Sequence, residues 1–156
     1  MAAAARQLTP VTLELGGKSP AIVLADADLE VTARRLVWGK GLNAGQTCVA
    51  PDHLLVVPEV REPLVAAIRT ELERLYGSDP ISNPDLGAIV NEQRFAHLSG
   101  LLEGAAGRVL AGGQTDPARR RISPTLIAVP DPDHDPLMQE EVFGPLLPLV
   151  TVADLE

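Results

Sequence analysis

Hydrophobic residues recur at helical spacing in three stretches of the chain, residues 29–44, 61–76 and about 93–105. The first stretch follows Asp28, a residue type that caps helix N-termini, and the second ends at Gly77, which is typical of a helix C-terminus. These patterns predict three amphipathic helices.

Between these helices lie short apolar runs that predict strands. Residues 11–17 alternate apolar and polar positions before a Gly-Gly turn, while the other runs are continuous; they cover residues 20–28, 53–59, 108–113, 122–130 and 146–152. Strands that alternate with helices favour an α/β fold, with a mostly parallel open sheet and flanking helices.

Both ends of the sequence cut into this pattern. The chain begins nearly inside a strand, and residues 151–156 read as a strand followed by the start of a helix. A parallel sheet cut in this way would expose an edge and an apolar face. We therefore expect the 156 residues to be part of a larger protein.

Composition and charge exclude several classes of function. The net charge of −8 argues against nucleic-acid binding, which needs a basic face, and the short basic run 119–121 is interpreted as a solvated turn. No run of about 20 apolar residues predicts a membrane segment. The N-terminus does not resemble a secretory signal, so a cytoplasmic protein is expected.

Common catalytic and binding motifs are missing. The run Gly17-Lys18-Ser19 lacks the earlier glycine of a phosphate-binding loop, because position 12 is Thr12, and no G-x-G-x-x-G or G-x-S-x-G occurs. The three histidines are too far apart for metal-ligand spacing, so no metal site is predicted.

The single cysteine, Cys48, lies in the stretch 43-NAGQTCVAPD-52. A thiolate attacks carbonyl carbon well, and small residues such as Gly45 let the backbone approach a ligand closely. A lone cysteine is also among the most commonly buried residues, so a structural thiol is the alternative.

Carboxylates supply the other candidate groups. Glu14 lies between two leucines before Gly16, and a partly buried carboxylate there would suit a general base; the alternative is a surface residue of an edge strand. In 139-QEEVFGP-145, two carboxylates precede Phe143, although an ordinary loop would also fit.

Three segments in this order resemble the aldehyde dehydrogenase superfamily: 13-LELGGKSP-20, 43-NAGQTCVAPD-52 and 139-QEEVFGPLLP-148. The form GQTCVAPD, with WGK upstream, is most similar to the class 3 branch. The resemblance implies that residues 1–156 are part of a catalytic domain, and that the main cofactor-binding domain and a C-terminal segment lie outside them.

The resemblance also implies a role for each matching residue. Cys48 would be the nucleophile that forms a thiohemiacetal and then a thioester with an aldehyde, and Glu14 would be the general base. Glu141 would bind the nicotinamide ribose of NAD or NADP, with Phe143 packed beside it. Leu15 and Gly16 would border the nicotinamide.

The full-length relatives are expected to be homo-oligomers. The role of this chain itself stays open. It is either the catalytic part of an aldehyde dehydrogenase or a non-catalytic remnant that associates with another polypeptide. A third possibility is ester hydrolysis by Cys48 without hydride transfer.

Overall fold

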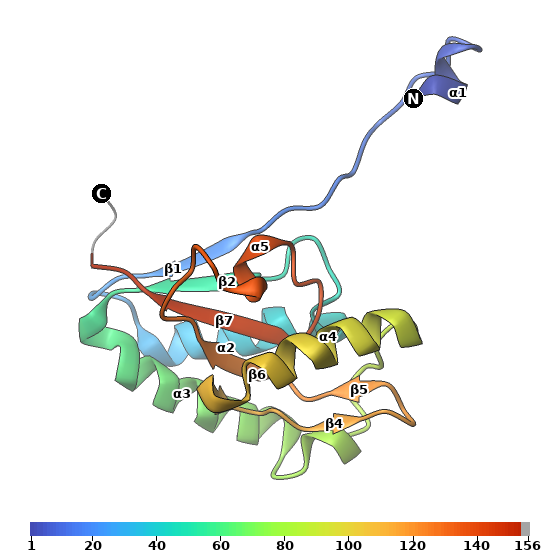
Figure 1. Cartoon of the computed structure of the whole chain (residues 1–156). Helices are drawn as coiled ribbons and strands as arrows, with labels where there is room; N and C mark the ends of the chain where they lie inside the picture. Colours follow the sequence, from blue (N-terminus) through green and yellow to red (C-terminus); the bar gives the residue numbers. More distant parts are fainter. Residues whose placement is uncertain (154–156) are drawn as a thin grey trace.

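The computed structural model describes residues 1–153 (Figure 1). Its α-helices are α1 (Ala2–Ala5), α2 (Leu29–Gly41), α3 (Pro58–Tyr76), α4 (Glu92–Gly104) and α5 (Pro136–Gln139). Short 3-10 turns cover Leu42–Gly45, Pro80–Ser82 and Ala106–Arg108. The strands are β1 (Pro20–Val23), β2 (His53–Val56), β3 (Val109–Ala111), β4 (Thr115–Asp116), β5 (Arg121–Ile122), β6 (Thr125–Ala128) and β7 (Leu146–Thr151).

Five of the strands form one mixed sheet in the order β1-β2-β7-β6-β3. The first four are parallel to their neighbours, and only β3 runs antiparallel, against β6. The helices α2 and α3 lie side by side along one face of the sheet, and α4 covers the other face (Figure 1). The predicted α/β fold with a mostly parallel sheet is therefore confirmed.

The alternation of side chains along β7 divides the core in two. Leu147 and Leu149 join the cluster beneath α2 and α3, whereas Leu146 and Val150 join the cluster beneath α4. Successive side chains of a strand point to opposite faces, so a central strand covered on both sides must be apolar throughout. This explains why the run 146–150 is continuously hydrophobic.

Most of the predicted helices and strands are present, but some of their bounds differ and one predicted strand is absent from the described residues. All three long helices are present, but α3 begins at Pro58, because proline is favoured at the first helical position, and β2 therefore ends earlier than predicted. The strand predicted over residues 11–17 is wrong: these residues have no regular structure and are mostly exposed. They alternate correctly, but no strand within residues 1–153 pairs with them. The helix start predicted after residue 151 falls on residues 154–156, outside the described residues.

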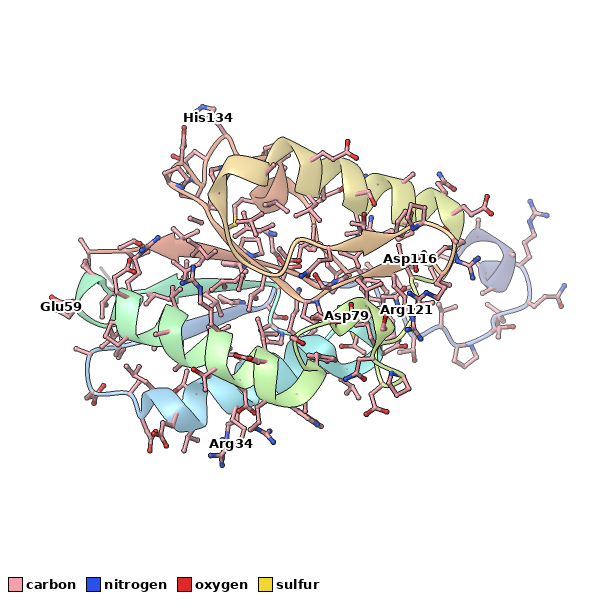
Figure 2. The ribbon with its side chains drawn as sticks, turned by 90° about the horizontal axis from the view of Figure 1, so that it is seen from below. Arg34, Glu59, Asp79, Asp116, Arg121 and His134 are labelled. Atoms are coloured by element: carbon pink, nitrogen blue, oxygen red, sulfur yellow. The ribbon has the colours of Figure 1, made fainter. Side chains whose placement is uncertain are left out.

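The small β4–β5 hairpin was not predicted. The hairpin contains the whole basic run 119–121, and the last residue of this run, Arg121, lies in β5 and is not a solvated turn residue. The Arg121 guanidinium donates to the carbonyl oxygens of Ile81 and Asn83, at 2.9 and 3.1 Å, and Figure 2 shows it beside the loop that contains Asp79. The basic run therefore fastens the hairpin to the loop after α3.

No helix within residues 1–153 is long and apolar enough to cross a membrane. The same residues bring together no three His, Cys, Asp or Glu side chains that could hold a metal ion. The cytoplasmic location stays a prediction.

Candidate active site

Three segments meet at one edge of the sheet because each leads into one of three neighbouring strands. The segment around Gly16 precedes β1, the Cys48 loop precedes β2, and residues 139–145 precede β7. These strands are parallel and adjacent, so their amino ends share an edge. Ligands of open α/β sheets usually bind at the carboxyl ends of the strands. The candidate site lies at the opposite edge.

Cys48 occupies the tip of a tight turn. The Ala50 N–H donates to the carbonyl oxygen of Thr47 at 3.2 Å, which makes Cys48 and Val49 the central residues of the turn. Both side chains are exposed. The backbone N–H of Cys48 donates no hydrogen bond within residues 1–153. The turn therefore presents both the thiol and a free N–H to a ligand.

The approach to this turn is tightly packed. Asn43 and Ala44 both have left-handed backbone conformations, with φ near 52° and 54°, and Gly45 follows with φ 72°. A Cβ atom on Gly45 would lie 2.2 Å from the carbonyl oxygen of Gly144. Only glycine fits there, because both the φ angle and the contact exclude a side chain. The cysteine loop is thus pressed against the segment that ends at β7.

A partly buried ion pair joins all three segments. Asp52 accepts hydrogen bonds from the Lys18 ammonium at 2.5 Å and from the Val142 N–H at 2.7 Å. The Lys18 ammonium also donates to the carbonyl oxygens of Leu137 and Glu140, at 2.8 and 2.9 Å. One lysine therefore connects the entry to β1, the entry to β2 and the entry to β7.

The charge of Asp52 is stabilised despite its burial. Burial alone would raise the pKa of this carboxyl, but its hydrogen bonds outweigh that effect and hold the pKa below its usual value. His53 contributes little to this as a donor, because its Nδ1 lies 3.7 Å from Asp52 and makes no hydrogen bond within residues 1–153. We attribute the lowered pKa of Asp52 to Lys18 and the Val142 N–H.

Lys40 is a second buried amine near Asp52. Burial lowers its pKa from 10.5 to about 8, partly offset by the attraction of Asp52. The side chain is only 2% exposed, and it lies beside a small void lined by Ile68, Leu72 and Pro145, among others. The edge of the sheet beneath the site therefore holds two amines and one carboxylate.

The structure brings two of the predicted cofactor-binding residues together. Gly16 has φ 80°, and a Cβ atom on it would lie 2.3 Å from Oε2 of Glu141. The Glu141 carboxylate makes no hydrogen bond or ion pair within residues 1–153. It therefore lies against the bare backbone of Gly16 with its oxygens available to hydroxyl groups.

Glu14 and Leu15 lie just before this contact, on an extended segment that leaves the body of the molecule (Figure 1). Of the two alternatives for Glu14, the structure shows the exposed side chain, and Glu14 makes no ion pair or hydrogen bond in the described part of the chain. The Leu15 side chain is 86% exposed. These two residues are therefore close in sequence to the site but are not fixed within it.

Phe143 borders an open pocket of about 430 Å³ on the α4 side of the site. Its backbone is left-handed, with φ 42°, a rare conformation for a large residue that is often associated with function. Glu140 and three residues of α4 also line the pocket, which extends to Val90 and Asn91; the α4 residues are Gln93, Arg94 and His97. The Arg94 guanidinium donates to the carbonyl oxygen of Val142 and so connects α4 to the segment that carries Phe143.

The similarity of the chain to known proteins identifies its family. The family model for the aldehyde dehydrogenase family matches residues 1–156. The chain belongs to the aldehyde dehydrogenase family. Aldehyde dehydrogenase family 3 member B1 of Mus musculus is 50% identical over 156 residues, which are 100% of this chain and 33% of the relative. The predicted similarity to the class 3 branch is thereby confirmed.

Two further aldehyde dehydrogenases support the assignment. The relative named "Aldehyde dehydrogenase, dimeric NADP-preferring" of Rattus norvegicus is 47% identical over 156 residues, 100% of this chain and 34% of its own length. A solved structure described as the substrate-bound state of Staphylococcus aureus AldH has 42% sequence identity and a TM-score of 0.93. The match covers 98% of this chain and 33% of that one. The chain spans about a third of the length of the curated relatives it matches.

Several residues of the site were not identified from the sequence. Lys18, Gln46 and Asp52 were identified only as parts of their motifs, and Arg94 was not considered. Lys18 and Asp52 are 34 residues apart, so no local pattern links them. The residue types could have indicated this ion pair. A lysine lies just before one apolar strand and an aspartate just before another, and opposite charges at neighbouring strand ends can pair.

Proposed function

We propose that this chain carries the nucleophile and part of the cofactor site of an NAD(P)-dependent aldehyde dehydrogenase, which oxidises an aldehyde to a carboxylic acid. The observation that carries the proposal is the meeting of the Cys48 turn, the Gly16–Glu141 contact and Phe143 at one edge of the sheet. Residues 1–156 would be part of the catalytic domain.

The residues present fit the nicotinamide half of a dinucleotide. The Glu141 carboxylate has free acceptor oxygens that suit a ribose diol, and the missing side chain at Gly16 leaves room beside it. Phe143 offers an aromatic face at the rim of the neighbouring pocket. NAD(P), when bound, would supply the acceptor for the hydride that leaves the substrate. We propose that the adenine half binds in parts of the enzyme that this chain does not span.

The chemistry of the chain's own residues starts at Cys48. Its thiolate attacks the carbonyl carbon of the aldehyde, a C–S bond forms, and the carbonyl oxygen becomes an anion that the free Cys48 N–H can stabilise. After oxidation to the thioester, Glu14 takes a proton from water. The resulting hydroxide attacks the acyl carbon, the C–S bond breaks, and the thiolate is regenerated as the acid leaves.

A second function, association with another polypeptide, is favoured by the segment that carries Glu14. Leu8, Leu13 and Leu15 are 93%, 50% and 86% exposed. Apolar side chains spaced along an extended segment are typical of a surface that another chain or domain covers. For the complete enzyme we propose a homo-oligomer, since the name of the rat relative describes it as dimeric.

Acyl transfer to Cys48 tests the proposed function. We expect p-nitrophenyl acetate to acetylate Cys48 and release p-nitrophenolate, with one acetyl group found on Cys48 by mass spectrometry. Cys48→Ser should abolish the adduct while leaving the circular dichroism spectrum unchanged, because Cys48 is exposed. In a longer enzyme in which further contacts hold Glu14 near the thioester, Glu14→Gln should slow release of the acetyl group by about 100-fold. A folded wild-type chain with an unmodified cysteine would contradict the proposal.

A further inference from the structure

Gln46 is a buried polar residue two positions before the proposed nucleophile. Its side-chain amide donates to the carbonyl oxygens of Asn43 and Ala88, at 2.9 and 3.1 Å, and its carbonyl oxygen accepts from the Val90 N–H at 2.9 Å. The residue is 8% exposed. Both N–H donors and the acceptor of the amide are therefore used, all with backbone partners.

The partners at Ala88 and Val90 show how the amide works. In an extended backbone, groups of residues two apart face the same side, and the residue between them faces the other side. Ile89 does face the other side: its N–H donates to the carbonyl oxygen of Arg120 at 2.8 Å. Gln46 therefore takes the place of a strand neighbour along residues 88–90 and fixes their register with its side chain.

The same glutamine braces its own loop. The Asn43 side-chain amide donates to the backbone carbonyl of Gln46 at 3.0 Å, while the Gln46 N–H and side chain both donate to the carbonyl of Asn43. This reciprocal pair spans the two left-handed residues that precede Gly45. Such conformations are unfavourable for residues other than glycine and persist only where surrounding contacts impose them.

The register that Gln46 fixes reaches the pocket beside Phe143. Val90, whose N–H is held by Gln46, lines that pocket together with Asn91, the N-cap of α4. One rigid amide therefore links the turn that carries Cys48 to the wall of the pocket. A shift of either part relative to the other must break at least one of these hydrogen bonds.

We propose that Gln46 is a positioning residue for Cys48, whose side-chain amide holds the cysteine turn in register with the pocket wall at residues 88–90. The proposal rests on the proposed function of Cys48 as the nucleophile. It assigns to Gln46 a role in acyl transfer that simple packing would not have, because packing alone makes no demand on both donors and the acceptor of the amide.

The test separates positioning of the thiol from its intrinsic reactivity. In the complete 156-residue chain we would measure acetylation of Cys48 by p-nitrophenyl acetate and alkylation by iodoacetamide, which needs no site geometry. For Gln46→Ala and Gln46→Glu, we expect the ratio of acetylation to alkylation rates to fall about tenfold or more, since small misplacements cost large factors in rate. The exchange rate of the Val90 N–H should rise about tenfold or more in the same variants, because its acceptor is lost.

Gln114 provides the matched control. It is an exposed glutamine on the β4 side of the hairpin, so Gln114→Ala and Gln114→Glu should leave the rate ratio and the Val90 exchange unchanged. Variants of Gln46 that lose Val90 protection but keep the wild-type rate ratio would overturn the positioning role. Unchanged Val90 exchange would overturn the clamp itself, with circular dichroism showing whether each variant is folded.

The proposed function can fail separately. If the wild-type ratio equals that of a short peptide with a free cysteine, Cys48 gains nothing from the site and the nucleophile assignment is wrong. In that case the positioning role falls with it, whereas the exchange of Val90 still decides whether Gln46 holds the loop.

Discussion

Cys48 and Glu14 are assigned to the same reaction, yet the segments that carry them are held in different ways. The cysteine turn is fixed by Gln46, by the contact of Gly45 with Gly144, and by Asp52 four residues later. The Glu14 segment is first anchored at Gly16 and Lys18, beyond the carboxylate. Contacts within the described residues therefore position Cys48, the proposed nucleophile, whereas no hydrogen bond or ion pair among them holds Glu14, the proposed general base.

The largest effect on the free energy of unfolding is expected from a substitution that disrupts the cysteine turn. Gly45→Ala places a Cβ atom 2.2 Å from the Gly144 carbonyl oxygen in a left-handed conformation. We expect the free energy of unfolding to fall by about 4 kcal/mol, measured by urea denaturation. Gly100→Ala, in open space on α4, is the control and should leave the free energy equal or slightly higher. Equal effects of the two changes would show that the turn is not under this constraint.

The second largest effect is expected for the partly buried ion pair of Lys18 and Asp52. Asp52→Ala leaves Lys18 without its carboxylate, and we expect a loss of about 3 kcal/mol in the free energy of unfolding. The pKa of Asp52 is lowered in the folded state, so its contribution is present at neutral pH and is lost as the pH falls below 3.8 through the folded-state value. Denaturation curves at pH 3 to 7 should show a smaller decrease for the variant. A parallel decrease in both proteins would exclude Asp52 as its source.

At Lys40 we expect the opposite effect, a substitution that stabilises the folded chain. Burial lowers its pKa from 10.5 to about 8, so the charged amine destabilises the folded chain at neutral pH. We expect Lys40→Met to raise the free energy of unfolding by about 2 kcal/mol at pH 7. Wild-type stability should approach that of the variant between pH 8 and 10.5, where the folded state has already lost the proton that the unfolded state still binds. A constant difference across this range would refute the assignment.

The smallest effect on the free energy of unfolding is expected at Gly16, two residues after Glu14. Gly16→Ala also introduces a side chain at positive φ, but the only contact is with the flexible end of Glu141. We expect a loss of about 1 kcal/mol in the free energy of unfolding. Gly17→Ala, with no atom within 4 Å and no positive φ, should change it by less than about 0.5 kcal/mol. A loss at Gly16 as large as at Gly45 would remove the contrast between the two segments.

The elements that could be predicted are those whose signal is local. The long helices repeat their apolar residues every three to four positions, and the runs that became β2, β6 and β7 are hydrophobic because both faces of the sheet are covered. The prediction over residues 11–17 failed because alternation describes how a strand faces a core, and this segment has neither a core nor a strand beside it.

The residues that assemble the site could not be predicted in the same way. The motifs that resemble the family indicated Cys48, Glu141 and Gly16, but not what holds them together. Gln46 reaches across 44 residues to Val90, and Asp52 across 90 residues to Val142. Such bonds depend on the strand order β1-β2-β7, which no local pattern specifies.

The place of β7 in the sheet has a consequence for folding. The pair β1–β2 can form early with α2 and α3, but β7 must insert between β2 and β6 after a long stretch of intervening chain. Pairing across such separations is slow, because the entropy of closing the loop must be overcome before any contact rewards it. The Gly144 carbonyl and the Val142 N–H, which immobilise the cysteine turn, arrive together with β7. The cysteine turn therefore completes its set of contacts only when β7 has paired with β2.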